Sequence, residues 1–273
     1  MDRGERMRSL FGAPRALIGV VHVAALPGTP CGGASVAEIA ARAAADARAY
    51  HAAGFDAILL ENMHDRPYLK GAVGPEIVAA ITAAGCEVRR AVPLPLGVQL
   101  LAAANTEAIA VAHAIGGAVV RVEGFVFAHV ADEGVIESCA GALLRYRKAI
   151  GAEHVRVFAD IKKKHSAHAI TADVDLAETA RAAEFFGADG VIVTGVATGR
   201  ETDPADVAAA RAAGGLPVFT GSGVTAENLA RFDAADGLIV GSSAKRGGHW
   251  SNPVDERRAC DLARNFKGRD SSL

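Results

Sequence analysis

The sequence predicts an α/β protein whose single domain is a (β/α)8 barrel, also called a TIM barrel. Over the 273 residues, eight short apolar runs of strand length alternate with segments that carry helix signals. The second, fourth, sixth and eighth runs share one pattern, in which small residues lead into the apolar stretch, and this internal echo indicates repeated double units. A doubly wound open sheet is the competing architecture.

The expected strands are short runs of β-branched and other apolar residues bounded by glycine, proline or charged residues. They cover residues 16–21, 56–60, 95–98, 118–122, a run that starts at 155, 190–193, 217–219 and 237–240. In a barrel these strands are parallel, so their carboxyl ends and the loops that follow them gather at one face.

Helices are expected where a cap or a proline marks a start. Ser35, with Glu38 three residues later, has the spacing of a capping box and predicts a helix that runs to about Gly54. Further helices are expected from 74–76 onward, over 106–115 and 179–186, from 204 to 214, and from 252–253 onward.

No low-complexity linker or shift of composition divides the chain. One domain is therefore expected over residues 15–268, with an exposed lead-in at 1–14 and a tail at 269–273. The lead-in contains arginines, but it also contains Asp2 and Glu5 and lacks an apolar stretch, which argues against a secretory signal.

Composition excludes several classes of partner. The formal net charge of −2 predicts no general attraction to nucleic acid. No apolar run reaches about 18 residues, so no transmembrane helix is expected, whereas peripheral association with a membrane and assembly into a homo-oligomer stay open. The four cysteines are far apart and have no metal or redox spacing, which is typical of reduced thiols in a cytoplasmic protein.

Every expected strand ends in a polar residue, at the face where barrels place their active sites. Packing alone hardly explains why polar side chains gather at the ends of all the strands. Their gathering predicts a substrate site. The candidates at these ends are His22, Glu61, Asn62, Gln99, Arg121, Glu123, Asp160, Lys162, Thr194, Ser222 and Ser242. Among them Asn62, Arg121, Glu123 and Thr194 are expected to bind substrate.

The last two strand ends predict a phosphate seat. The residues concerned are Gly221, Ser222 and Gly223 after the seventh strand and Gly241, Ser242 and Ser243 after the eighth. Barrels commonly bind phosphate at these two loops. Glycine lets the backbone approach an anion, and exposed N–H groups favour it. Simple tight turns would explain the same glycines.

The end of the fifth strand carries the densest charge. Alternation along a strand puts Asp160, Lys162 and Lys164 on one side, with His165 following. A lysine beside an aspartate can form a Schiff base, transfer a proton or hold a substrate oxyanion. Glu61 and His22 are expected to position the reacting end. A salt bridge at the rim, or a solvated loop, is the alternative.

A divalent metal stays open, although no cofactor is predicted. Glu61, Glu123 and Asp160, with His22 or His165, have the chemistry that magnesium, manganese or zinc prefers. No HxH or HExxH spacing supports a metal site. The loop at 125–134 is longer and more apolar than a minimal connection, which predicts a lid, a surface for a partner, or core packing.

Several long motifs resemble the BtpA/SgcQ family. They are the stretches 18–30, 61–68, 131–134, 144–147 and 158–165, and the likeness runs from about Leu17 to beyond Trp250. The resemblance implies a TIM barrel similar to phosphate-binding barrels such as ribulose-phosphate epimerases and tryptophan-biosynthesis enzymes. A cyanobacterial member of this family is implicated in the accumulation of photosystem I at the thylakoid membrane, which implies a second kind of role.

We therefore expect an enzyme that acts on a small phosphorylated metabolite, either a sugar phosphate or a nucleotide-derived compound. Isomerase, lyase and hydrolase chemistry are not separated by the sequence. The alternative is a non-catalytic assembly or stability factor for a membrane complex. Convergent ionisable groups at the strand ends favour the enzyme, because a scaffold has no need of them.

Overall fold

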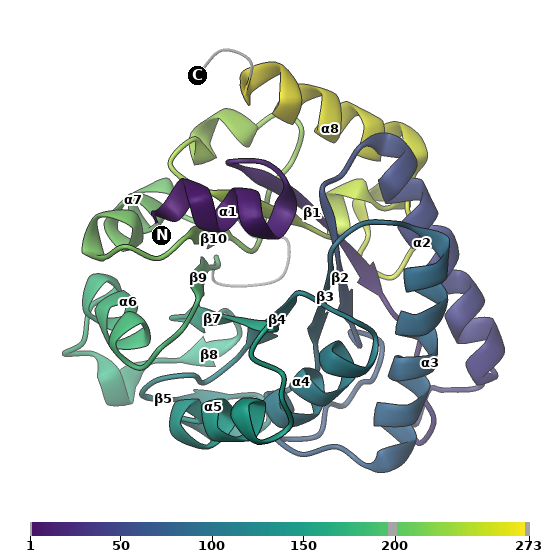
Figure 1. The fold of residues 1–273 in the computed structure, drawn as a ribbon, viewed down its shortest axis with the longest axis horizontal. Coiled ribbons are helices and arrows are strands. Elements are labelled where there is room, and N and C mark those ends of the chain that lie inside the picture. Colours follow the sequence, from purple (N-terminus) through teal and green to yellow (C-terminus); the bar gives the residue numbers. More distant parts are fainter. Residues whose placement is uncertain (1, 196–200, 271–273) are drawn as a thin grey trace.

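The computed structural model describes residues 2–195 and 201–270 and shows a closed barrel of eight parallel strands (Figure 1). The strands are β1 (Ala16–His22), β2 (Ala57–Glu61), β3 (Leu96–Gln99), β4 (Val119–Val122), β7 (Arg156–Ile161), β9 (Gly190–Val193), β10 (Val218–Thr220) and β11 (Gly237–Val240). Each begins within one residue of its predicted start. The predicted barrel is confirmed and the open sheet is wrong, because β1 pairs with both β2 and β11.

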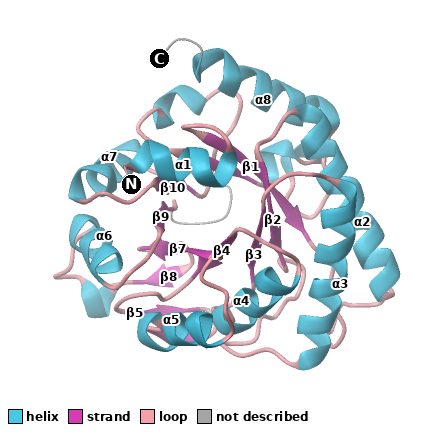
Figure 2. Ribbon diagram, in the orientation of Figure 1, coloured by secondary structure: helices cyan, strands magenta, loops and turns pink. Residues whose placement is uncertain are grey.

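Helices surround the barrel on its outer face (Figure 2). They are α2 (Val36–Ala53), α3 (Pro75–Ala91), α4 (Asn105–Ala114), α5 (Ala140–Ala149), α6 (Leu176–Phe185), α7 (Pro204–Ala213) and α8 (Glu256–Asp270). The capping box of Ser35 and Glu38 is confirmed, and Gly54 ends α2 with a positive φ of 91°. Within 2–195 and 201–270, no helix combines the length and apolar character needed to cross a membrane.

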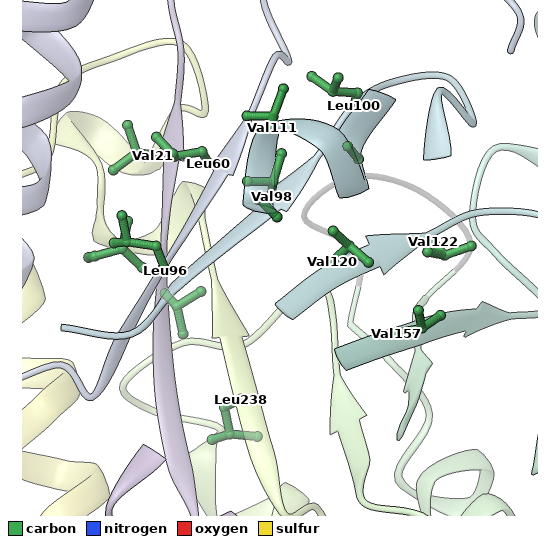
Figure 3. Close-up of a cluster of buried hydrophobic side chains, with 14 of the residues drawn as sticks. Val21, Leu60, Leu96, Val98, Leu100, Val111, Val120, Val122, Val157 and Leu238 are labelled. Carbon is green, nitrogen blue, oxygen red and sulfur yellow. The ribbon is translucent and has the colours of Figure 1, made fainter. Parts of the chain in front are cut away.

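Side-chain alternation sorts the strand residues into two sets. One set points outward and packs against the helices, as Figure 3 shows for Val21, Leu60 and Val98 beside Val111 of α4. The other set points inward and fills the barrel with side chains such as Leu59. The inward set becomes polar toward the carboxyl ends of the strands.

The amino-terminal segment is not the exposed lead-in that the sequence suggested. It forms α1 (Arg3–Phe11), which lies across one end of the barrel (Figure 1). Met7 is fully buried and Phe11 is 8% exposed, and the ring centroid of Phe11 lies 6.4 Å from that of Phe158 and 6.0 Å from that of Phe219. Residues i and i+4 share one helix face, so this pair closes the amino-terminal end of the barrel.

The other end of the chain differs little from the expectation. Helix α8 runs to Asp270, two positions into the predicted tail at 269–273, and residues 271–273 lie outside the described part of the chain.

A small second sheet covers part of the opposite end of the barrel. β5 (Ala128–Ala131) and β6 (Gly134–Glu137) form an antiparallel hairpin, and β8 (Ser166–Ala167) pairs with β5. We call this three-stranded sheet the lid sheet. Ile136 of β6 is buried, and Phe125, which precedes β5, belongs to the hydrophobic core around the barrel. Both core packing and an exposed surface, which were alternatives for this loop, are present.

Candidate functional site

A layer of polar side chains forms the top of the barrel interior. His22 pairs in register with Glu61, and Glu61 pairs with Gln99, so these inward positions lie at one level. Arg121 and Asp160 continue the layer on β4 and β7. All of these side chains except His22 are less than 9% exposed. The sequence predicted this layer correctly because the alternation of a strand is a local property.

Two adjoining cavities open above the polar layer. The first has a volume of about 210 Å³ and lies between β1, β10 and β11. The second has a volume of about 330 Å³ and lies over β2, β3, β4 and β7. Glu61, Met63, Arg121 and Lys164 line both cavities, so a single ligand can extend from one into the other.

The first cavity contains the complete predicted phosphate seat. Its lining includes Gly221, Ser222, Gly223, Gly241, Ser242 and Ser243. Gly223 adopts a φ of 70°, which other residues rarely tolerate. The backbone N–H groups of Ser222, Gly223 and Val224 have no acceptor among the described residues. These free donors give the seat the chemistry of an anion site.

Two of the seat's hydroxyl groups maintain its loops. The Ser222 hydroxyl accepts a hydrogen bond from the backbone N–H of Gly195 at 2.6 Å. The Ser243 hydroxyl donates to the carbonyl of Val224 at 2.6 Å and so ties the loop after β11 to the loop after β10. The backbone of the seat is therefore held in place from within.

Arg258 of α8 supplies a cation to the first cavity beside Arg121 and Lys164, and little in the sequence indicated it. Its Nε donates to the Ser243 carbonyl at 2.7 Å, and its side chain lines the first cavity. Lys245, which follows the seat directly in sequence, is fully buried and pairs with Asp46 at 2.7 Å. In the sequence, the one feature that could have pointed to Arg258 as a cation at this cavity was its position in the first turn of the last helix.

His22 presents a neutral imidazole to the first cavity. Its Nδ1 donates to the carbonyl of Trp250 at 2.7 Å, because a carbonyl can only accept, and its Nε2 is therefore unprotonated. Burial, followed by repulsion from Lys245, lowers the pKa of His22 to about 3. A Cβ added to Gly241 would lie 3.2 Å from Nε2, so the ring packs closely against this glycine.

Two buried ion pairs organise the second cavity. Arg121 Nε lies 3.1 Å from both carboxylate oxygens of Asp160. Lys163 Nζ lies 3.1 Å from Glu123 Oε1. Burial alone would lower the pKa of Arg121, but Asp160 and then Glu61 raise it above its ordinary value. Arg121 is thus a permanent cation with its Nε bound to Asp160.

The prediction that Lys162 lies beside Asp160 was wrong. β7 ends at Ile161, and Lys162 has a φ of 49°, so the alternation of the strand stops there. Its Nζ donates to the carbonyl of Thr171 at 2.9 Å, and its side chain lines neither cavity. Lys163 and Lys164 supply the cations of the second cavity instead.

Glu61 and Lys164 line both cavities and have no charged or hydrogen-bonding partner for their side chains among the described residues. Neither the carboxylate of Glu61 nor the ammonium of Lys164 makes a hydrogen bond or ion pair with any residue of 2–195 or 201–270. Burial, followed by repulsion from Arg121, lowers the pKa of Lys164, and attraction to Glu61 opposes this shift. A carboxylate and a lysine with a lowered pKa suit proton transfer.

Three other predicted residues have different surroundings. Asn62 lines neither cavity, because its Oδ1 accepts from Leu101 N at 2.7 Å and its Nδ2 donates to Asp65 at 2.9 Å. Thr194 Oγ1 accepts from the backbone N–H of Lys164 at 2.9 Å and so positions that lysine. His165 is exposed and lines the second cavity, and burial of its ring, followed by repulsion from Lys164, lowers its pKa.

Metal-binding chemistry has little support in the described part of the chain. No three His, Cys, Asp or Glu side chains there are close enough together to hold an ion. The carboxylates of Glu123 and Asp160, two of the predicted ligands, pair with Lys163 and Arg121.

A sequence profile described as the BtpA family matches residues 13–268 of this chain. The chain belongs to the BtpA family. An uncharacterized mitochondrial protein of Caenorhabditis elegans is 45% identical over 255 residues, which are 91% of this chain and 92% of that protein. The photosystem I biogenesis protein BtpA of Synechocystis is 35% identical over 250 residues, 91% of this chain and 86% of its own length.

Solved structures show that the BtpA-family barrel is shared with other proteins. It is similar to thiamine phosphate pyrophosphorylase from Pyrococcus furiosus, with a TM-score of 0.56 and 14% identity over 93% of this chain and 96% of that one. For phosphoribosyl anthranilate isomerase from Thermus thermophilus the TM-score is 0.57 at 14% identity, over 92% of this chain and 98% of that one. At such identities the likeness shows the fold alone.

Proposed function

We propose that this BtpA-family protein is an enzyme that acts on a small phosphorylated metabolite. One observation carries the proposal: the cavity that contains the whole predicted phosphate seat is continuous with the free carboxylate of Glu61 and the free ammonium of Lys164. A ligand held by its phosphate in the first cavity would place its other end over these two groups.

The seat suits a phosphate group for two physical reasons, and a third observation shows that His22 does not contribute to its charge. Free N–H groups of the loop after β10 offer hydrogen bonds to anionic oxygens. Arg258 adds a guanidinium at the rim. The low pKa of His22, about 3, leaves its Nε2 unprotonated, so this side chain adds no positive charge to the seat.

The chemistry at the other end is proton transfer next to a carbonyl group. In this proposal Glu61 takes a proton from the carbon beside the carbonyl. Arg121 and Lys164 stabilise the negative charge that develops on the oxygen, and the proton returns to a neighbouring carbon or leaves with a departing group. Isomerases and lyases share this first step.

The structural neighbours add support by analogy. The names of two of them, thiamine phosphate pyrophosphorylase and phosphoribosyl anthranilate isomerase, contain a phosphorylated compound. Barrels of this kind bind phosphate after their last two strands, the position of the seat in this chain.

A thermal-shift experiment with two variants of one residue tests the proposal. Inorganic phosphate and a panel of sugar phosphates are added to the wild type, to Ser242→Asp and to Ser242→Ala. A ligand at 100 times its Kd stabilises the wild type by about 2.7 kcal/mol. Aspartate puts a like charge into the seat and abolishes the shift, whereas the alanine control keeps it. If no phosphorylated compound shifts the wild type, the proposal is wrong.

A second candidate function has one specific observation in its favour. The lid sheet exposes Phe127, Val130 and Val135 to solvent by 38%, 40% and 49%. Such apolar side chains suit a protein partner, as a biogenesis factor for a membrane complex would need. Under this alternative, removing the charges of Asp160 and Lys162 leaves partner binding intact, whereas polar changes at the three lid residues abolish it. A cytoplasmic location stays a prediction in either case.

A further inference from the structure

Gln99 carries a buried hydrogen-bond acceptor that the protein itself does not use. Its side chain is 2% exposed, lies on β3 and lines the second cavity. Its Oε1 has no hydrogen-bond partner among the residues of 2–195 and 201–270. Buried polar atoms nearly always have a partner, and leaving one unpaired costs stability, so this oxygen calls for an explanation.

A network of charges fixes which side of the amide carries the oxygen. Gln99 Nε2 lies 3.5 Å from Glu123 Oε1, and a carboxylate only accepts, so the NH2 group faces Glu123. Glu123 is held by Lys163 at 3.1 Å and by the backbone N–H of Ala103 at 3.0 Å. The amide oxygen therefore keeps its orientation away from Glu123.

Three further acceptors line the second cavity, besides the cations already described. Glu61 lies beside Gln99 in register on β2, and its carboxylate is free. Asp132 and Glu133, from the turn of the lid sheet, line the same cavity. A ligand that satisfies Gln99 and these carboxylates must bring several hydrogen-bond donors, as a compound with several hydroxyl groups does.

Trp250, the largest aromatic side chain of the second cavity, is less suited to a nucleobase because its ring is already engaged. A base needs an aromatic surface on which to stack. The indole of Trp250 already packs against the guanidinium of Arg66, 4.9 Å from the ring centroid, and stacks with His249 at 5.9 Å and 29°. Two further rings lie beside it, with centroids 4.8 Å away for His64 and 6.2 Å away for His22.

We infer that the second cavity binds the hydroxyl groups of a sugar phosphate and that Gln99 Oε1 accepts a hydrogen bond from one of them. This inference rests on the proposed function, because the phosphate in the first cavity sets the position of the sugar. Gln99 is then a specificity residue, and its orphaned oxygen is a preformed part of the binding site.

Calorimetry with matched ligands and variants tests this inference. The ligands are n-propyl phosphate, which has a phosphate and no hydroxyl group, ribose 5-phosphate, glucose 6-phosphate and adenosine 5′-monophosphate. Gln99→Met keeps the length of the side chain and removes the oxygen. Thr220→Val is the control, because Thr220 Oγ1 is also buried without a partner but lines neither cavity.

The expected result separates the hydroxyl contact from the phosphate seat. At least one sugar phosphate binds the wild type more tightly than propyl phosphate does. Gln99→Met lowers the affinity for that sugar phosphate about tenfold or more. Binding of propyl phosphate stays unchanged, and Thr220→Val binds all ligands as the wild type does. Without ligand, the melting temperature of Gln99→Met is no lower than that of the wild type. If Gln99 had only a structural role, the variant would be less stable than the wild type.

Three outcomes overturn the inference. If propyl phosphate binds as tightly as both sugar phosphates, or Gln99→Met weakens all ligands equally, the seat stands and the hydroxyl contact is wrong. If adenosine 5′-monophosphate binds most tightly and Gln99→Met does not affect it, the cavity takes a nucleotide. If neither propyl phosphate nor inorganic phosphate binds, the proposed function fails and the inference fails with it.

Discussion

The two halves of the barrel mouth present their polar groups in different ways. On the side of β10 and β11, the phosphate seat consists of backbone N–H groups on loops rich in glycine, with one guanidinium from Arg258. On the side of β2, β3, β4 and β7, the second cavity consists of charged side chains, most of them paired across strands.

The two halves therefore rely to different degrees on contacts with distant parts of the chain. The backbone donors of the seat lie in two turns, so most of its residues are close together in sequence, and Gly195 and Arg258 reach it from outside these turns. A side-chain network needs partners from separate strands, such as Arg121 and Asp160, which are 39 positions apart. The first half is therefore expected to tolerate changes elsewhere in the barrel, whereas the second half depends on each of its pairs.

The largest effect is expected from breaking the pair in the side-chain half. Arg121→Met leaves Asp160 buried without its cation and destabilises the protein by about 3–5 kcal/mol. Urea unfolding followed by circular dichroism measures the loss. The double variant Arg121→Met/Asp160→Leu recovers most of it, because no buried charge is then unpaired. A loss below about 1 kcal/mol in the single variant would show that the network is not interdependent.

A smaller effect is expected when the pH is lowered, because the protonation of His22, beside the seat, changes the free energy of unfolding. The pKa of His22 is lowered from 6.5 to about 3, so the native chain stays neutral at this position while the unfolded chain takes up a proton below pH 6.5. The contribution of His22 is complete above pH 6.5 and is lost as the pH falls toward 3. At pH 5 the loss amounts to about 2 kcal/mol.

His22→Gln supplies the comparison for this pH effect, because glutamine donates to the Trp250 carbonyl and does not titrate. Unfolding free energies are measured at pH 7 and pH 5 for both proteins. The wild type is expected to lose about 2 kcal/mol more than the variant between these values. Equal losses in the two proteins would contradict the neutral imidazole.

The smallest effect is expected from a change at Lys162, whose side chain lies outside both cavities. Lys162→Ala removes one hydrogen bond to the Thr171 carbonyl and changes stability by about 1 kcal/mol or less. Phosphate binding, measured by calorimetry, stays the same. Lys164→Met is the matched variant, and it weakens phosphate binding about tenfold because Lys164 lines both cavities. If Lys162→Ala weakens binding as much, the assignment of the two lysines is reversed.

Some residues of the site could be predicted from the sequence and others could not. The sequence placed the glycine turns of the proposed phosphate seat and the inward polar layer at the strand ends, since turn glycines and strand alternation are visible in short stretches of residues. Phosphate binding itself stays a prediction. Lys163 was missed because the strand alternation stops at Ile161, before the positive φ of Lys162, whereas the charge pattern suggested that it continues to Lys164. Arg258 was missed because α8 returns to the seat only in the folded barrel.

From the sequence alone come the order of the eight barrel strands, the polar strand ends and the glycine turns of the proposed seat. These features follow from preferences that a few neighbouring residues set. The tertiary structure decided the position of α1 at the base of the barrel, the pairing of Arg121 with Asp160 and of Lys163 with Glu123, and the orphaned oxygen of Gln99. Those features depend on contacts between residues far apart in the chain, which no short stretch of sequence specifies.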